Sequence, residues 1–215
     1  MQLFRDALSA LRAKLRFIKY IFIVGLRYTC NKPITSRVYL PSLLTILGLT
    51  GKGVEVGVCL GEYSEMILSY SKLTTLYLVD PWREFNRDAY FDTANVNQEE
   101  QDKRYEFVIE KFQRYGKRVK ILRNTSSEAH PLFNMEELDF IYIDANHSYE
   151  ECKRDLEMWW PKLKARGVFA GHDYIDNLTW NWRVKKAVDE FINKEKQKLF
   201  ITNGEFPTWY LIKKI

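Results

Sequence analysis

The sequence is poor in cysteine. Its three cysteines, Cys30, Cys59 and Cys152, are scattered along 215 residues, form no CxxC pair and have no histidine at zinc-finger spacing. This pattern argues against a disulfide framework and against a structural zinc site. We therefore expect a reducing compartment and predict a cytoplasmic location.

Long apolar runs are also missing. The run at residues 20–26 lies between Lys19 and Arg27 and is far shorter than the roughly 20 residues needed to cross a bilayer. No small-residue cleavage site follows it, so neither a transmembrane segment nor a signal peptide is expected. Internal repeats and linkers are lacking too, and an apolar fraction of 46% is typical of one globular domain with its own core.

Acidic residues are almost absent from residues 1–32, which hold seven Lys or Arg and the single Asp6, whereas the rest of the chain is near neutral. We predict a leader over residues 1–35 and one domain over 36–215. Apolar residues in the leader recur at spacings of four and three, which predicts an apolar stripe along one helix. The stripe would pack on the protein's own domain or on a second copy in a homodimer, or would lie on an anionic membrane surface as a peripheral contact. Its members are Phe4, Leu8, Leu11, Leu15, Ile18 and Phe22.

Strands are predicted to alternate with helices along the rest of the chain. The expected strands are 53–58, 76–79, 119–122, 138–143 and 168–170, and the expected helices are 38–49, one from about 64, 98–115, 149–163 and 182–196. Residues 199–202 and 209–212 are predicted to pair as an antiparallel hairpin. This order predicts an α/β fold with a Rossmann-like, doubly wound, mostly parallel sheet and an antiparallel C-terminal edge strand.

Several polar or glycine residues stand where predicted strands end, namely Gly57, Asp80, Asp144 and Asp173. The carboxyl ends of parallel strands meet at one edge of a sheet, and ligands of doubly wound folds bind beyond that edge. We therefore expect one ligand site built from these positions.

The first predicted strand leads into a turn of the form E-x-G-x-x-x-G-x-x-S, in which Glu55, Gly57, Gly61 and Ser64 hold the fixed places. Glycines there let the backbone approach a ligand closely. The spacing differs from the G-x-G-x-x-G turn that brings a pyrophosphate to a helix N-terminus. It suits the zwitterionic amino-acid moiety of S-adenosylmethionine, with the acidic residue holding structure or water around the ammonium group. The alternative is a purely structural glycine at a strand end.

Asp80 is placed to accept hydrogen bonds from the ribose hydroxyls of an adenosine cofactor. NAD enzymes share that carboxylate, but the first turn and the C-terminal hairpin favour S-adenosylmethionine. Trp82 would stack on the adenine and Ser126 would reach its edge, although an aromatic residue after Asp-Pro is as often a simple loop anchor.

The chain resembles a family at four segments, VEVGV at 54–58, LVDPW at 78–82, DFIYIDANHSY at 139–149 and GHDY at 171–174. From about residue 53 onward it is similar to class I S-adenosylmethionine-dependent methyltransferases of the macrocin and mycinamicin O-methyltransferase type and to cephalosporin hydroxylase-like proteins. The resemblance implies a seven-stranded sheet, S-adenosylmethionine as cofactor, bound in part by Asp144, and in many members a divalent metal.

The resemblance also implies ligands and a base. Asp144, His172 and Asp173 match the metal positions, but His172 stands where an acid is usual, and imidazole suits iron or manganese better than it suits magnesium. We keep Mg, Mn and Fe as candidates. His147 matches a general base near the acceptor hydroxyl and is expected to act with Asp144 in catalysis. The alternative is that His147 caps the helix starting near Ser148.

Three functions remain open at this point. The leading hypothesis is methyl transfer to an oxygen of a small-molecule acceptor, such as a sugar or glycolipid hydroxyl. The second is a metal-dependent oxygenase related to cephalosporin hydroxylase, and the third is a catalytically idle cofactor-binding module held at a membrane or a partner by the leader. Nucleic acid is not expected as a partner, because the positive charge is confined to the leader.

Overall fold

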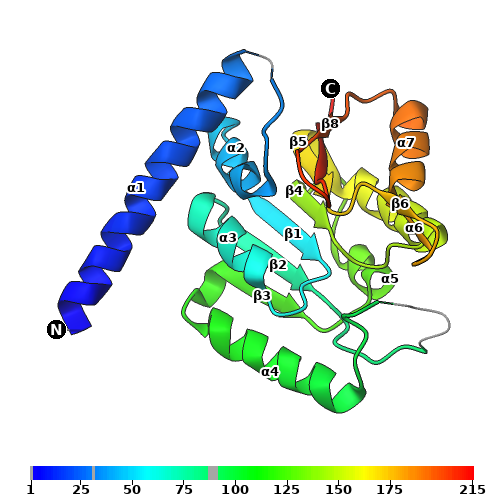
Figure 1. The fold of residues 1–215 in the computed structure, drawn as a ribbon, viewed down its shortest axis with the longest axis horizontal. Helices are drawn as coiled ribbons and strands as arrows, with labels where there is room; N and C mark the ends of the chain where they lie inside the picture. Colours follow the sequence, from blue (N-terminus) through cyan, green and yellow to red (C-terminus); the bar gives the residue numbers. More distant parts are fainter. Residues whose placement is uncertain (1, 31, 87–91) are drawn as a thin grey trace.

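The computed structural model describes residues 2–30, 32–86 and 92–215, and its centre is a seven-stranded sheet (Figure 1). The strands lie in the order β3-β2-β1-β4-β5-β9-β8. β1 to β5 pair in parallel, whereas β9 runs antiparallel to both β5 and β8. The predicted fold class is confirmed, with one added detail: β8 forms the edge, and the antiparallel strand β9 lies beside it. The bounds are β1 Lys52–Val56, β2 Thr75–Val79, β3 Val119–Leu122, β4 Leu138–Ile143, β5 Leu163–Gly171, β8 Phe200–Ile201 and β9 Trp209–Ile212.

Helices cover both faces of the sheet, because neighbouring residues of a strand point to opposite sides. In β4, Phe140 and Tyr142 pack with one set of helices, and Ile141 and Ile143 pack with the other. All six residues of β4 are buried, as expected for the central strand of a parallel sheet. The first set is α2 (Leu40–Ile46), α3 (Glu62–Tyr70) and α4 (Gln98–Gln113), and the second is α5 (Ser126–Ala129), α6 (Tyr149–Trp159) and α7 (Val184–Glu195).

Three predicted helices differ in the structure. The segment 149–163 is α-helical only over α6, which ends at Trp159, and β5 begins at Leu163. The segment 182–196 is helical only over α7, since Trp182–Arg183 form β7, which pairs with β6 (Asp176–Asn177) in a separate two-stranded sheet. The segment 38–49 contains the 3-10 turn η1 (Arg37–Tyr39) and then α2. Pro41 lies in the first turn of α2, where a helix tolerates proline because no backbone donor is needed there.

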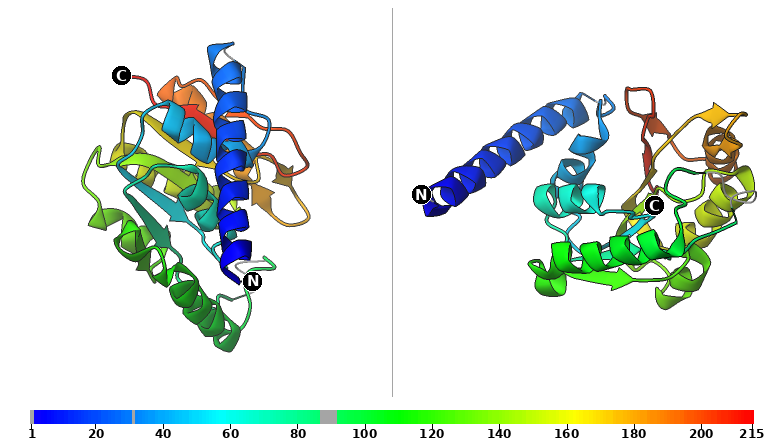
Figure 2. Two further views of the ribbon diagram at one scale, coloured as in Figure 1. Left: turned by 90° about the vertical axis from the view of Figure 1, so that its left-hand side faces the viewer. Right: turned by 60° about the horizontal axis from the view of Figure 1, so that its bottom comes forward.

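The leader forms one helix, α1 (Gln2–Thr29), whose C-terminal half packs on the domain. Val24 is fully buried, and the ring of Tyr20 lies 5.0 Å from the rings of Tyr39 and Tyr70. The N-terminal half extends away from the rest of the molecule (Figures 1 and 2). Among the described residues, no helix is long and apolar enough to cross a membrane.

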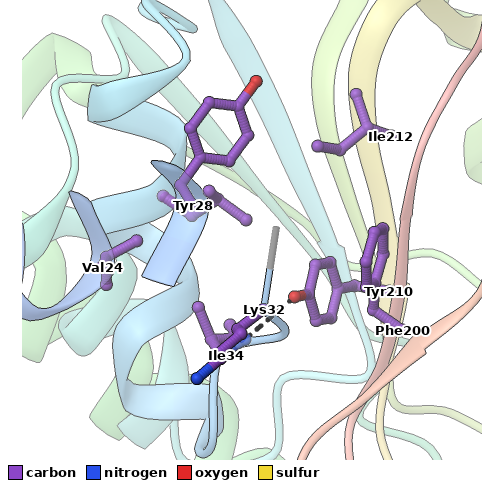
Figure 3. A pocket seen from close by; sticks show the side chains of 8 residues that line it. Val24, Tyr28, Lys32, Ile34, Phe200, Tyr210 and Ile212 are labelled. Atoms are coloured by element: carbon purple, nitrogen blue, oxygen red, sulfur yellow. Dashed lines mark hydrogen bonds between the residues drawn. The ribbon is translucent and has the colours of Figure 1, made fainter. Parts of the chain in front are cut away.

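The end of α1 meets the domain at a small pocket lined mainly by apolar side chains of α1, α2, β8 and β9 (Figure 3). On its wall, the hydroxyl oxygen of Tyr210 accepts the backbone N–H of Ile34 at 3.0 Å. The backbone N–H of Asn203 likewise donates to the carbonyl oxygen of Thr35 at 3.1 Å. Val24 shares a buried cluster with the domain, so the division at residue 35 stays a prediction.

Candidate functional site

The turn between β1 and α3 depends on two glycines. Gly57 has φ 88°, and a Cβ added there would lie 1.9 Å from the carbonyl oxygen of Asp144. Gly61 precedes α3 with φ 68°, and a Cβ there would lie 2.4 Å from the ring of Phe112. Only glycine adopts both the conformation and the close approach without strain. The end of β1 therefore touches the end of β4 directly.

Glu55 and Ser64 support this turn from inside the protein. Both are buried, and the Ser64 hydroxyl donates a hydrogen bond to the Glu55 carboxylate, which ties β1 to α3. Burial raises the pKa of Glu55 to about 8, and the bond from Ser64 offsets part of this rise. The pair thus holds the turn in place, and a role toward a bound ammonium group stays a prediction.

Asp80 lies at the end of β2, across from this turn. Its carboxylate accepts the backbone N–H groups of Val58 and Cys59 at 2.9 Å each and that of Trp82 at 2.8 Å. Burial raises the pKa of Asp80, while these backbone bonds lower it. Asp80 therefore joins the two strand ends at the position expected for a ribose contact, and that contact remains a prediction.

Trp82 does not fit its predicted role. Its side chain is fully buried, its indole N–H donates to the carbonyl oxygen of Cys59 at 2.9 Å, and its ring packs 5.1 Å from that of Tyr105. No face of the indole is left for an adenine, so the structure favours the loop-anchor interpretation. Cys59 has φ 51°, which shows how tightly the backbone turns at this anchor.

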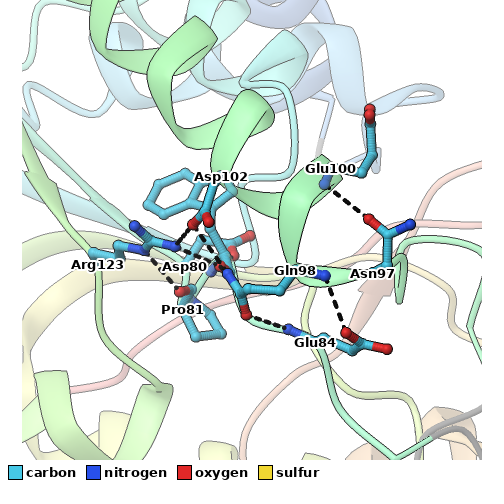
Figure 4. A network of polar contacts seen from close by, with 9 residues as sticks. Asp80, Pro81, Glu84, Asn97, Gln98, Glu100, Asp102 and Arg123 are labelled. Atoms are coloured by element: carbon cyan, nitrogen blue, oxygen red, sulfur yellow. Dashed lines mark hydrogen bonds and ion pairs between the residues drawn. The ribbon is translucent and has the colours of Figure 1, made fainter.

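A polar network fixes the loop that follows Asp80 to α4 (Figure 4). Gln98 donates to the carbonyl oxygen of Trp82 at 3.1 Å and to Asp102 at 3.0 Å. Arg123 donates to the same carbonyl at 3.0 Å and pairs with Asp102. The loop beside the predicted cofactor site is thus held by charge-assisted bonds.

Ser126 also departs from the prediction. Its hydroxyl donates to Asp155 and accepts the indole N–H of Trp159 at 2.8 Å. The hydroxyl thus acts as donor and as acceptor in two bonds that connect α5 to α6. Burial raises the pKa of Asp155 to about 7, and the bond from Ser126 opposes that rise. The side chain of Ser126 is therefore a structural link here rather than a free donor for an adenine edge.

Three side chains converge beyond the ends of β4 and β5, namely Asp144, His147 and Asp173. One ligand atom from each lies within 4.8 Å of the others. The Nε2 atom of His147 lies 3.0 Å from Oδ2 of Asp173 and 3.6 Å from Oδ1 of Asp144. The sequence predicted Asp144, His147 and Asp173 near this edge, and the structure brings the three side chains together.

The environment of His147 is dominated by carboxylates. Its Nδ1 atom lies 3.2 Å from Asp92, and its ring packs 4.4 Å from that of Trp182. Burial alone would lower the pKa of His147, but the close carboxylates of Asp144, Asp173 and Asp92 outweigh burial and raise that pKa to about 11. Burial alone would raise the pKa of Asp173, but its contacts with His147 and His172 hold that pKa well below its usual range.

One buried atom of this cluster forms no hydrogen bond with the described residues. The Nε2 atom of His147 is buried and, among the described residues, has no hydrogen-bond partner, because the neighbouring Asp173 oxygen is close but not in line with an N–H. Buried polar atoms normally have a partner, so an orphan of this kind calls for an explanation such as an ion. His147 does not cap α6, whose N-cap is Ser148.

His172 lies outside the group of three. Its Nδ1 atom contacts Asp173 Oδ1 at 2.8 Å, and its backbone N–H donates to Ile143 at 3.0 Å. His172 therefore orients Asp173. We predicted His172 as a metal ligand, but in the structure His147 is the histidine that lies between Asp144 and Asp173. Sequence reasoning missed Asp92, which lies between β2 and α4, and Arg37, whose guanidinium lies 3.7 Å from Asp144. Neither residue stands at a strand end, so no sequence spacing marks them.

Comparison with known proteins decides the family. Residues 54–174, more than half of the chain, match the family described as "Methyltransferase domain". The chain belongs to this family. The match runs from β1 to just past Asp173 and so contains the glycine turn, Asp80 and the group of three. The prediction of a methyltransferase domain is confirmed at that level.

Individual relatives of this methyltransferase domain are distant. The uncharacterized protein y4gI of Sinorhizobium fredii is 25% identical over 121 residues, which is 56% of this chain and 12% of that protein. This chain therefore spans only a small part of that relative's length.

Solved structures agree with the fold. The O-methyltransferase NovP is 16% identical with a TM-score of 0.61, and the alignment covers 94% of this chain and 100% of that one. An O-methyltransferase family protein from Burkholderia thailandensis is 10% identical with a TM-score of 0.58, covering 82% and 55%. At such identities the likeness shows a shared fold. The finer resemblance to macrocin-type enzymes stays a prediction.

Proposed function

We propose that this methyltransferase domain transfers the methyl group of S-adenosylmethionine to a hydroxyl oxygen of a small-molecule acceptor, with a divalent cation held by Asp144, His147 and Asp173. The observation that carries the proposal is the buried Nε2 atom of His147, which lies between two carboxylates and, among the residues that the structure describes, forms no hydrogen bond to either. A cation bound to all three would supply the missing partner.

The charges and donor types fit a divalent cation. With a neutral imidazole, the carboxylates of Asp92, Asp144 and Asp173 face the guanidinium of Arg37, which leaves two negative charges uncompensated. A divalent cation neutralises them. Two carboxylates with one imidazole suit Mn²⁺ or Fe²⁺ better than Mg²⁺, which prefers oxygen ligands alone.

The candidate site has a donor side and an acceptor side, and different residues serve each. On the donor side, Gly57 lets the end of β1 contact the end of β4, and Asp80 holds the turn and would offer its carboxylate to the ribose. The donor supplies an activated methyl group on a sulfonium. On the acceptor side, a cation lowers the pKa of a coordinated hydroxyl, and the closed arrangement orients the two reactants.

This proposal revises the role expected for His147. A general base must be deprotonated near the working pH, but the three surrounding carboxylates raise the pKa of His147 to about 11. Without a cation, the imidazole therefore holds its proton at neutral pH rather than accepting one. A divalent cation bound at Nε2 would take the place of that proton, because only a neutral imidazole binds a metal. We therefore assign His147 to the cation, with Asp144 beside it, and assign no separate base.

Aromatic residues border the acceptor side. Trp182 packs against His147, and its ring lies 5.0 Å from that of Trp180 and 6.3 Å from that of Phe206. Trp180 and Phe206 are 39% and 38% exposed, so part of this wall faces solvent. Exposed ring faces beside a reactive group suit an acceptor with a ring of its own, and a sugar ring is one such acceptor.

Cation binding tests the proposal without knowledge of the acceptor. Titration with Mn²⁺, followed by the loss of the electron paramagnetic resonance signal of the free ion, should show binding to the purified protein. His147→Ala and Asp173→Asn should each weaken it by at least about 10-fold, since even outer partners of metal ligands contribute that much. Glu99→Gln serves as the control, because it also removes one carboxylate but on an exposed face of α4.

Transfer is tested with labelled donor and fractions of small-molecule extracts, with and without a chelator. Label appearing on an acceptor oxygen only when Mn²⁺ or Fe²⁺ is restored supports the proposal. Transfer at full rate in a chelated, metal-free enzyme would contradict the cation. Acceptor hydroxylation without donor consumption would favour the oxygenase hypothesis, and donor binding without any transfer would favour the idle module.

A further inference from the structure

Helix α1 carries an apolar stripe that the domain leaves uncovered. The apolar side chains of this stripe, from Leu8 to Leu26, are between 37% and 66% exposed. Phe22 and Ile18 are the most exposed of them, at 66% and 63%. At 3.6 residues per turn they fall within an arc of about 80°. The stripe consists of Leu8, Leu11, Leu15, Ile18, Phe22 and Leu26.

The domain contacts a different face of the same helix. Val24 is fully buried and Tyr20 packs on Tyr39 and Tyr70, and these positions lie well over 90° around the helix from the centre of the stripe. The helix is therefore fixed to the domain by one face and presents the stripe outward. Figure 2 shows that its N-terminal half extends clear of the sheet and the other helices.

Positive charge borders the stripe on both sides. Lys14 lies on one flank, and Lys19, Arg12 and Arg5 lie on the other, all of them exposed. The sequence of α1 contains six Lys or Arg and one acidic residue, Asp6. An apolar stripe between two basic flanks matches a surface that is apolar inside and anionic outside.

The charges also argue against a second copy as the occupant. The stripe has the alternating spacing of a coiled-coil seam, so two copies of α1 would pair along it. Lys14, Arg12 and Lys19 would then occupy the flanking positions that face each other across the seam. In a parallel or an antiparallel pair, these positions bring basic residues against basic residues, which is unfavourable.

We propose that α1 is a peripheral membrane-binding helix, which lies along an anionic lipid surface with the stripe inserted among the acyl chains near the headgroups. A helix of 28 residues is about 42 Å long, so it presents the whole stripe to the surface at once. The basic flanks contact the anionic headgroups, and the domain is held on the side of the helix that faces away from the stripe.

The test uses the full chain and vesicle flotation, with phosphatidylcholine alone or mixed with phosphatidylglycerol. The protein should float with the mixed vesicles, and raised salt should weaken the association. Ile18→Glu should reduce partitioning by about 10-fold or more, since one buried isoleucine contributes at least that much. Leu132→Glu is the matched control, because Leu132 is also 63% exposed but lies far from α1 in the sequence.

Charge is tested separately. Arg12→Glu with Lys19→Glu should weaken partitioning into the mixed vesicles by at least about 25-fold, at about 5-fold for each lost positive charge. Lys72→Glu with Lys117→Glu makes the same change in net charge at exposed sites outside α1 and should leave partitioning unchanged. Donor binding confirms that each variant is folded.

The proposal fails if the wild-type protein does not float with anionic vesicles, or if Ile18→Glu floats as well as Leu132→Glu. It also fails if sedimentation in lipid-free buffer shows a dimer that Ile18→Glu converts to a monomer. That result would assign the stripe to a second copy of the chain.

Discussion

Replacing Gly57 with alanine tests the contact between the glycine turn and the carboxylate cluster. The new Cβ would lie 1.9 Å from the carbonyl oxygen of Asp144 and 2.5 Å from its carbonyl carbon, so the two backbones must separate by about 1.1 Å even to reach 3.0 Å. The positive φ of 88° adds about 1–2 kcal/mol for any residue with a Cβ. Overpacking of a rigid neighbour costs a further 1–3 kcal/mol or so, and we expect about 2–5 kcal/mol of destabilisation in all.

Gly116→Ala provides the matched control for this experiment. Gly116 also has a positive φ, of 52°, but an added Cβ there meets nothing within 4 Å. Urea denaturation followed by tryptophan fluorescence should show a small loss of stability for Gly116→Ala, about 1 kcal/mol, and a loss for Gly57→Ala that is larger by the steric contribution.

Ligand binding gives a second measurement on the same pair. Because the displaced backbone carries Asp144, Gly57→Ala should also weaken Mn²⁺ binding, and Gly116→Ala should not. Equal stability losses in the two variants, with Mn²⁺ binding intact in both, would refute the idea that this contact positions the cluster.

Three further predictions follow from the site. Burial raises the pKa of Glu55 from 4.5 to about 8, so the folded state holds this proton more tightly than the unfolded chain does. The resulting contribution to the free energy of unfolding is complete below pH 4.5 and is lost as the pH rises through about 8. Urea denaturation at several pH values should show this decline in the wild type and a flatter curve for Glu55→Gln. Asp80→Ala leaves three backbone donors without their acceptor and should weaken donor binding by about 1–3 kcal/mol in calorimetry. Trp182→Ala should raise the acceptor KM by about 3–10-fold while donor affinity stays unchanged, and an unaltered KM would remove Trp182 from the acceptor site.

Much of the fold could be predicted because its signals are local. Each central strand is a short apolar run that ends in a glycine or an aspartate, and parallel strands bring those ends to one edge. The positions of Gly57, Asp80, Asp144 and Asp173 in the structure agree with that reasoning.

The errors concern side chains whose direction depends on distant packing. Trp82 follows a strand end, but its ring enters the core against Tyr105, which is 23 positions away in the sequence. Ser126 follows β3, but its hydroxyl is used by Asp155 and Trp159, which are 29 and 33 positions away in the sequence. Such contacts form only after the chain has folded, so no local pattern of residues reveals them.

The hydrogen bonds at Ile34 and Thr35 fix the chain between α1 and the candidate site, so a movement of α1 is not passed directly to the site. The chain runs from α1 through these two residues to Arg37, which contacts Asp144. Both residues are fastened to the β8–β9 hairpin, Ile34 by the hydroxyl of Tyr210 and Thr35 by the backbone of Asn203. A displacement of α1 along the chain would therefore have to break these two hydrogen bonds before it moved Arg37. We expect attachment of α1 to a surface to leave the contact between Arg37 and Asp144 unchanged.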